Sequence, residues 1–263
     1  MPNLELSVVI PAYNEAAVIA PTIEAIDDYL ARAGLAHEIL VVDDGSLDET
    51  AALARALAGA RPALRVLAGA HQGKGAAIKQ GVLDATGRYL LFLDADHSTR
   101  IEEIQKCLPW LREGCEVVIG SRKIPGAVIR VHQPPLREWM GKGFTWLTNT
   151  LLGVRVTDFT CGFKCFQTAV AQRLFRLQRI GGWGFDAELV FLADRLGYRI
   201  KEVPVEWAND ARTKVRLVRD SVRSFAEVVQ IRLGARRGWY ADRGEAAEPC
   251  EPLEALDLKG TPS

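Results

Sequence analysis

Two aspartates stand one residue apart at the end of a strongly hydrophobic segment, YLLFLDADHS. The segment 89–93 is almost wholly apolar, which predicts a strand buried on both faces of a parallel sheet. Ligands of open α/β sheets bind outside the carboxyl ends of the strands, where Asp94 and Asp96 would lie. Two carboxylates so close repel each other unless a cation lies between them. Mg²⁺ or Mn²⁺ held by this pair would also bind a substrate diphosphate; the alternative is a polar strand end that caps the next helix.

Basic residues stand at three further positions suited to phosphate. Lys74 lies between two glycines at the start of a predicted helix, where backbone N–H groups and the ammonium both suit an anion. An exposed lysine at a helix end is the alternative. Arg122 follows a predicted strand in the string VIGSR, and Arg137 lies on a helix opened by Pro134 and Pro135. A guanidinium group binds phosphate through two hydrogen bonds and stays charged near neutral pH.

Two more pairs of acids stand at expected element ends. Asp43 and Asp44 follow the apolar string EILVV, where a carboxylate can accept the imide N–H of a uracil or guanine ring; an Asp-Gly turn is the alternative. Asp186 and Glu188 lie in the string GFDAE. Either acid could take a proton from a hydroxyl acceptor, or the pair could orient sugar hydroxyls or cap a helix.

The composition indicates an ordinary globular chain. With 263 residues and 48% apolar content, the chain can bury the core of one domain, and its formal net charge of zero predicts no nucleic-acid partner. The five cysteines are an odd number at irregular spacing, which favours reduced thiols in a cytosolic protein. A strand is expected directly at the start, so we expect no signal peptide. No apolar run reaches the ~18 residues that a bilayer span needs.

The first half of the chain alternates predicted strands and helices. We expect strands at 6–10, 38–42, 64–67, 89–93 and 117–119, and helices at 15–33, 50–58, 75–85 and 102–112. This order implies a largely parallel sheet with right-handed crossovers. In the second half we expect an irregular segment at 125–133, helices at 136–152, 185–196 and about 215–236, and strands at 163–166 and 200–205.

The turn after the first strand excludes two common phosphate-binding folds. It reads PAYNE, without the G-x-G-x-x-G of a dinucleotide-binding unit, and the chain contains no G-x-x-x-x-G-K-[ST] string. Phosphates would therefore bind elsewhere, and the carboxylate pair is the expected place.

Five strings in order carry a family resemblance: VVIPAYNE, VVDDGSLDET, GKGAAIKQG, LLFLDADHS and VIGSR. With them the chain resembles the inverting family 2 glycosyltransferases of the α/β GT-A fold, a Rossmann-like and mostly parallel sheet flanked by helices. The later strings TDFTCGFKCF and GGWGFDAELVFLADRLGYRIKEVPVEW are most similar to the polyprenol-phosphate branch, and within it to the dolichyl-phosphate β-glucosyltransferases. The resemblance extends to about residue 240 and implies a catalytic domain over 1–240. The remaining residues, 241–263, are acidic and poor in apolar side chains, which predicts a disordered tail.

The resemblance also implies roles for the residues of the site. Mg²⁺ or Mn²⁺ would be bound by Asp94 and Asp96, and the acceptor phosphate by Arg122 and Arg137, although Gly141 stands where a hydroxyl residue is expected. Tyr13 would pack on the base, although it could instead be a core residue. Arg212 and Lys214 resemble a mobile basic loop that closes over the donor. The whole nucleotide-sugar set is Pro11, Tyr13, Glu15, Asp43, Asp44, Lys74, Asp94, Ala95, Arg212 and Lys214.

The expected helix 136–152 combines tryptophans with basic residues. Trp139 and Trp146 lie on it near Arg137 and Lys142, a pattern typical of a helix lying on a bilayer. The last helix is rich in arginine, which suits anionic lipid. The alternative is that both helices pack on the sheet and their arginines face water.

Three hypotheses follow for the function. The first is a peripheral enzyme at the cytoplasmic face of a membrane, which transfers glucose from UDP-glucose to a polyprenyl phosphate. The second is a soluble family 2 glycosyltransferase with a hydroxyl acceptor, for which Asp186 or Glu188 would be the base. The third is a non-catalytic module that binds a nucleotide sugar. The presence of Asp94, Asp96 and Arg122 together argues against the third.

Overall fold

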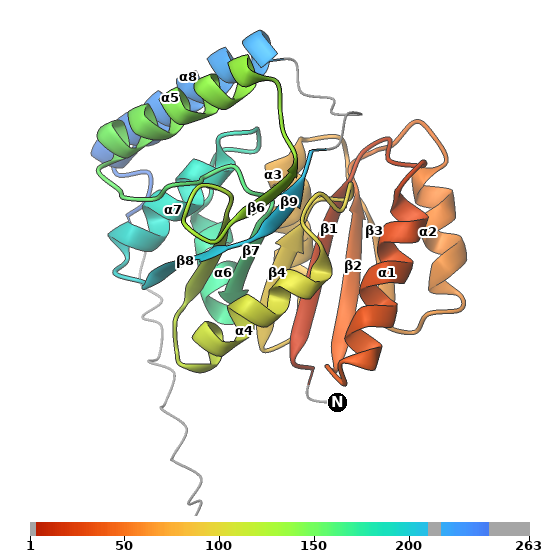
Figure 1. Ribbon diagram of the computed structural model, residues 1–263. Helices are drawn as coiled ribbons and strands as arrows, with labels where there is room; N and C mark the ends of the chain where they lie inside the picture. Colours follow the sequence, from red (N-terminus) through yellow and green to blue (C-terminus); the bar gives the residue numbers. More distant parts are fainter. Residues whose placement is uncertain (1–3, 210–216, 242–263) are drawn as a thin grey trace, which may run out of the picture.

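A seven-stranded sheet forms the centre of the computed structural model, which describes residues 4–209 and 217–241 (Figure 1). The strand order is β3-β2-β1-β4-β7-β5-β8. All neighbours pair in parallel except β7, so the parallel strands direct their carboxyl ends to one edge. The strands are β1 (Leu6–Ala12), β2 (His37–Asp43), β3 (Leu64–Ala68), β4 (Tyr89–Leu93), β5 (Val117–Ser121), β7 (Phe163–Gln167) and β8 (Ile200–Pro204).

The antiparallel strand β7 lies between β4 and β5. Its first residue, Phe163, pairs with Leu93, the last residue of β4. The residues before β7 therefore meet the aspartates after β4, although they lie far apart in sequence. This pairing brings the string TCGF to the carboxyl edge of the sheet.

Helices cover both faces of the sheet, because each buries one apolar stripe. On α1 the buried residues Ile19, Ile23, Ile26 and Leu30 recur at helical spacing. One core holds α1 (Ile19–Arg32), α2 (Thr50–Ala58) and α4 (Ile104–Arg112), which follows a short 3-10 turn at Ile101–Glu103. The other core holds α3 (Lys74–Asp84), α6 (Thr168–Leu177) and α7 (Phe185–Arg195).

Helices α5 (Pro135–Leu152) and α8 (Leu217–Arg236) pack against each other and stand away from the main sheet (Figure 1). Large apolar side chains on both helices stay exposed, above all Trp139 (73%) and Trp146 (69%) on α5 and Val222 (65%) on α8. No helix within residues 4–209 and 217–241 is long and apolar enough to cross a membrane.

Several elements differ from the sequence prediction. The segment 125–133 is not wholly irregular, because β6 (Val128–Val131) pairs with β9 (Glu206–Ala208), and an ion pair joins Arg130 to Glu206 across the two strands. The helix α6 was not predicted, although its buried residues have helical spacing. The first helix begins at Ile19 and not near residue 15, because the backbone before it turns to bond the loop after β2. The predicted tail, 241–263, lies outside the described residues from 242 onward.

Candidate active site

Asp94 and Asp96 follow β4 directly, as the sequence predicted. Lys74, the first residue of α3, places its Nζ 2.5 Å from Asp94 Oδ1. Burial opposes the charge of this ammonium, but Asp94 and then Asp186 raise the pKa of Lys74 above its usual range. Asp96 Oδ1 accepts a hydrogen bond of 2.9 Å from the backbone N–H of Ser98. Lys74 and Asp94, which were predicted to lie close together, therefore form an ion pair.

The arrangement of the two aspartates fits a divalent cation. Burial, and then the negative charge of Asp94, raise the pKa of Asp96, because the charge of Asp94 repels a second carboxylate. A cation between them would relieve this repulsion. Within residues 4–209 and 217–241, no group of three or more His, Cys, Asp and Glu side chains could hold a metal ion. Water and substrate phosphate would have to supply the remaining ligands, as is usual for Mg²⁺.

Gly162, just before β7, gives Asp94 its space. A Cβ atom at this glycine would lie 2.0 Å from Asp94 Oδ2. Any larger residue would displace the carboxylate. The sequence analysis did not select Gly162, because only the antiparallel pairing of β7 with β4 brings it to Asp94.

Asp44 organises the loop that leads to Lys74. Its two carboxylate oxygens accept the backbone N–H groups of Gln72 (2.8 Å) and Gly73 (2.9 Å). The neighbouring Asp43 accepts a weaker bond from Ser46 N (3.3 Å) within its own turn. Asp43 and Asp44 thus build two adjoining loops at the edge of the sheet, in addition to any contact with a ligand.

An aromatic pair lies beside Asp44. The rings of Tyr13 and His71 stack with centroids 4.3 Å apart, and His71 Nδ1 lies 3.1 Å from the carbonyl oxygen of Asp44. Tyr13 therefore lies close to the loop that follows β2, and its contact with a nucleoside stays a prediction. His71 was not predicted, since nothing in the sequence indicates that it reaches a residue so far away.

Three other residues predicted to bind the nucleotide sugar lie at or after the carboxyl ends of β1 and β4. Pro11 lies within β1, and the backbone N–H of Glu15 donates to Thr50 Oγ1 (2.7 Å). Ala95 is buried, and its carbonyl oxygen accepts a bond of 2.8 Å from the Thr22 hydroxyl. These bonds fix the loop after β1 and the loop after β4 to their surroundings.

Asp186 lies in the first turn of α7 and forms a buried ion pair with Lys164 of β7. Lys164 Nζ lies 2.5 Å from Asp186 Oδ1 and donates to the carbonyl oxygen of Cys161 at 2.7 Å. Burial raises the pKa of Asp186, although Lys164 and then Lys74 act in the opposite direction. Asp186 thus belongs to the same electrostatic group as Lys74 and Asp94. Lys164 was missed by the sequence analysis, because a lysine inside a central strand is unusual.

Glu188 faces different partners. Its carboxylate accepts the backbone N–H groups of Arg179 and Ile180, both at 2.9 Å, and the hydroxyl of Tyr240 at 2.6 Å. Burial raises the pKa of Glu188. These three bonds tie the segment before α7 to the turn that follows α8, which is a structural role for this side chain.

Arg122 is oriented by a fully buried carboxylate. Its Nε and Nη2 donate to the two oxygens of Asp158 at 2.7 and 2.8 Å, and Nη2 also donates to Thr160 Oγ1 at 2.9 Å. The guanidinium lies 5.1 Å from the ring centroid of Trp207. Burial alone would raise the pKa of Asp158, but the charge of Arg122 lowers it to about 2. Both members of this pair are therefore ionised near neutral pH.

Two further cations lie near Arg122. Lys123 Nζ donates to Thr145 Oγ1 on α5 at 2.8 Å and lies 3.8 Å from Asp158 Oδ1. Burial, and also the charge of Arg122, lower the pKa of Lys123 and of Arg137. The Thr145 hydroxyl in turn donates to the carbonyl oxygen of Gly141, one turn earlier, at 2.9 Å. Lys123 was not predicted as a site residue.

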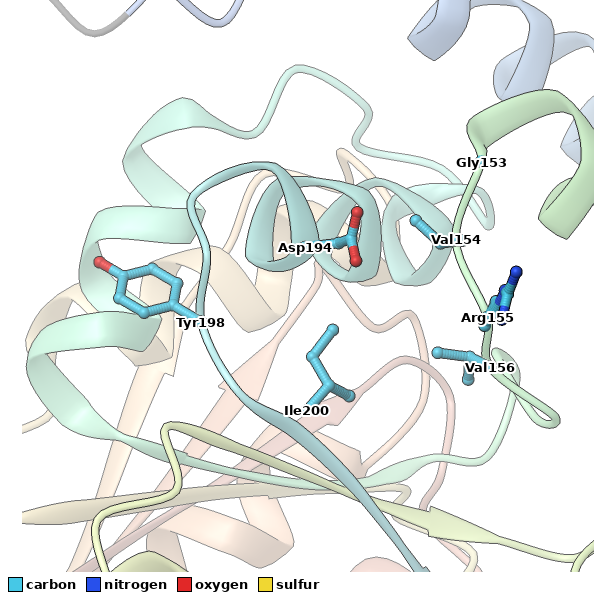
Figure 2. A pocket seen from close by; sticks show the side chains of 7 residues that line it. All are labelled: Gly153, Val154, Arg155, Val156, Asp194, Tyr198 and Ile200. Atoms are coloured by element: carbon cyan, nitrogen blue, oxygen red, sulfur yellow. The ribbon is translucent and has the colours of Figure 1, made fainter.

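Arg212 and Lys214, the predicted donor loop, lie outside the described residues. The pocket in Figure 2, of about 330 Å³, lies elsewhere: residues of the loop after α5 line it together with Asp194, Tyr198 and Ile200. It contains none of the predicted site residues.

The chain is similar to known proteins over most of its length. Residues 7–175 match the family model described as Glycosyl transferase family 2. A dolichyl-phosphate beta-glucosyltransferase of Trichomonas vaginalis is 34% identical over 259 residues, which cover 94% of this chain and 76% of that protein. The enzyme of the same name from Saccharomyces cerevisiae is 30% identical over 257 residues, covering 90% of this chain and 77% of that protein.

Among solved structures, glucosyl-3-phosphoglycerate synthase from Mycobacterium tuberculosis, in complex with Mn²⁺, uridine diphosphate and phosphoglyceric acid, has a TM-score of 0.63. It is 26% identical, and the match covers 88% of this chain and 79% of that one. The predicted fold and enzyme class are therefore confirmed: the chain belongs to glycosyl transferase family 2 and is a nucleotide-sugar-dependent glycosyltransferase of the GT-A fold.

Proposed function

We propose that this enzyme transfers glucose from UDP-glucose to the phosphate of a polyprenyl phosphate at a membrane surface. The observation that carries the proposal is a group of three cations at Arg122. Arg122 and Lys123 contact the buried Asp158, and Arg137 is close enough to Arg122 for the two charges to interact. Burial, and also the charge of Arg122, lower the pKa of Lys123 and of Arg137. Such a cluster favours an anionic acceptor over a neutral one. The names of the curated relatives support the same acceptor class.

The donor would bind along the carboxyl edge of the sheet. Tyr13 and Asp44, together with Pro11, Glu15 and Asp43, would hold the nucleoside, and Lys74 with Asp94 would meet the diphosphate. The described neighbour crystallised with Mn²⁺ and uridine diphosphate supports a uridine nucleotide and a divalent ion. Mg²⁺ or Mn²⁺ on Asp94 and Asp96 would stabilise the charge that develops on the leaving diphosphate. We include Arg212 and Lys214 in the donor site on the family resemblance alone.

The reaction would be one in-line displacement at the anomeric carbon. An acceptor phosphate oxygen forms a bond to this carbon while the bond to the diphosphate oxygen breaks, and UDP leaves with the bonding electron pair. An α-linked donor then gives a β-linked product. An ionised phosphate carries no proton on the attacking oxygen, so no general base is needed. The Lys74 ammonium, beside Asp94, would face the charge gained by the leaving group.

Asp186 then has a role other than proton removal. Lys164 fixes its carboxylate, and its place near Lys74 suits orientation of sugar hydroxyls. Glu188 is less suited to contact substrate, because its bonds to two backbone amides and Tyr240 hold it within the fold.

The exposed apolar side chains of α5 and α8 support a peripheral position on a membrane. Trp139 and Trp146 lie seven residues apart, on one face of α5, and the described side chains of α8 include exposed arginines. Thr145 on the same helix bonds Lys123, so α5 links this apolar face to the cation cluster. We place the enzyme on the cytoplasmic face, to which the four free, buried cysteines among the described residues are suited.

A panel of donors and acceptors tests the proposal. Purified enzyme with Mg²⁺ or Mn²⁺ is supplied with radiolabelled UDP-glucose, UDP-galactose or GDP-mannose, and with polyprenyl phosphate, free polyprenol or 3-phosphoglycerate. We expect label in the organic phase with UDP-glucose and polyprenyl phosphate alone, as a β-linked product. Asp96→Ala, or excess chelator, should abolish it.

Two results would overturn the proposal. Transfer to 3-phosphoglycerate or to another soluble hydroxyl acceptor, but not to the lipid, would favour the soluble enzyme, with Asp186 as the residue to test for the base. UDP-glucose binding without turnover on any acceptor would favour the binding module.

A further inference from the structure

A buried carboxylate on α8 lies apart from the residues considered so far. Glu227 is 7% exposed, whereas the other charged side chains described on this helix are arginines. Its Oε2 accepts the backbone N–H of Gly184 at 2.6 Å, and its Oε1 accepts Arg223 Nε at 3.1 Å. A buried charge is strongly destabilising unless it is paired, so these bonds indicate a fixed position.

The carboxylate fits directly onto the glycine-rich loop GGWG, residues 181–184. A Cβ atom at Gly182 would lie 2.2 Å from Glu227 Oε1, and one at Gly184 would lie 2.7 Å from Glu227 Cβ. Gly184 is also the N-cap of α7, where exposed N–H groups and the helix dipole favour a negative charge. Gly182 and Gly184 therefore leave the space in which the carboxylate lies against the backbone.

The other side of the loop touches the start of α3. The carbonyl oxygen of Gly181 accepts the backbone N–H of Gly75 at 3.1 Å. A Cβ atom at Gly73, which has φ +102°, would lie 2.8 Å from this same oxygen. The ring centroid of Trp183 lies 5.7 Å from Lys74 Nζ. The loop is thus held between Glu227 and the segment that carries Lys74.

We propose that Glu227 is a positioning residue through which α8 sets the places of Lys74 and Asp186. The carboxylate holds the GGWG loop against Gly75, and the same loop ends in the cap of α7, two residues before Asp186. Through this contact the helix with exposed apolar residues is joined to the ion pair at Asp94. The effect on turnover rests on the proposed transferase function, whereas the mechanical contact does not.

Kinetics test the effect on turnover. Glu227→Ala should lower kcat roughly 10- to 100-fold, because a small misplacement of a group that meets the leaving diphosphate is costly. The affinity for UDP, measured by calorimetry, should change less than threefold, since the contacts described for Glu227 involve neither Tyr13 nor Asp44. Glu227→Gln keeps an oxygen for the Gly184 N–H and should recover most of the rate. Glu24→Ala makes the same change at an exposed position of α1; it is the matched control and should leave kcat unchanged.

A double-mutant cycle isolates the contact. Gly182→Ala should lower kcat in the wild-type background, because the new methyl group displaces the carboxylate. It should have no further effect in Glu227→Ala, where no carboxylate remains to be displaced. Additive losses in the double variant would overturn the proposal, as would wild-type kcat in Glu227→Ala.

Amide hydrogen exchange tests the coupling without any turnover. In Glu227→Ala, peptides covering 181–186 and 73–77 should both exchange faster than in the wild type and in Glu24→Ala. Unchanged exchange at 73–77 would overturn the coupling even if the enzyme transfers glucose. Faster exchange at both segments would support it even if the acceptor proves to be a different molecule.

Discussion

The carboxylate of Asp94 lies against the backbone of Gly162, where a side-chain carbon would come within 2.0 Å of Asp94 Oδ2. Gly162→Ala should therefore push Asp94 away from Lys74 and lower the rate of glucosyl transfer roughly 100-fold. Initial rates across a Mn²⁺ titration, with melting temperatures beside them, provide the measurement. Gly59→Ala, where the nearest atom would be 3.6 Å away, is the control that should retain activity. A fully active Gly162→Ala enzyme would contradict the role given to this contact.

The buried ion pair of Lys164 with Asp186 predicts a large loss of stability when one partner is removed. Lys164→Met should lower the free energy of unfolding by about 3–5 kcal/mol, because it leaves a carboxylate buried without its partner. The double variant Lys164→Met/Asp186→Asn should regain part of this loss in urea denaturation. Lys106→Met removes a half-exposed ion pair with Glu103 and should lower the free energy of unfolding by less than about 1 kcal/mol. Equal effects of Lys164→Met and Lys106→Met would count against the buried pair.

Asp158 predicts that the folded protein loses stability as the pH falls into the acid range. Its pKa falls from the ordinary 3.8 to about 2 in the folded protein, so its contribution is complete above pH 3.8 and is lost as the pH falls towards 2. The shift corresponds to roughly 2 kcal/mol. The gap in unfolding free energy between wild type and Asp158→Asn should therefore narrow between pH 4 and pH 2. A gap that stays constant over this range would show that Arg122 does not depress the pKa of Asp158.

The exposed tryptophans of α5 predict that this helix binds to lipid vesicles. Trp139→Ala/Trp146→Ala should lower binding to anionic vesicles roughly tenfold in a sedimentation assay, since both side chains are more than two-thirds exposed. Binding by the wild type should weaken as salt rises, because salt screens the basic residues. Trp110→Ala removes a partly exposed tryptophan from α4 and is the control. If both variants bind like the wild type, another surface faces the membrane.

The first part of the parallel sheet was open to prediction, because β1 to β4 are short apolar runs, each followed by a helix. Lys74 lies beside Asp94 as predicted, although β3 and β4 are not neighbours in the sheet. The carboxyl ends of the parallel strands share one edge, and Asp44 holds the loop that leads to Lys74 along it. The strand β6 has no such pattern, since its residues are largely exposed and its pairing partner, β9, is distant in sequence.

The residues that the sequence did not reveal are mostly partners in long-range contacts. Lys164 and Gly162 reach the site only because β7 pairs with β4, and Glu227 contacts the GGWG loop only because α8 packs against it. Asp158 was not predicted either, because only its two bonds to Arg122 show what it does. Patterns within one element predicted which side chains could do chemistry, whereas contacts between elements determine how those side chains are held.

The insertion of β7 between β4 and β5 has a consequence for the order of folding. During synthesis, β1 to β4 can pair as soon as Leu93 has emerged, but the outer edge of β4 keeps unpaired amide groups until residues 163–167 follow. An open apolar edge of this kind readily pairs with another chain. The nascent first half is therefore the aggregation-prone stage, and the strand that completes the aspartate site is also the one that closes this edge.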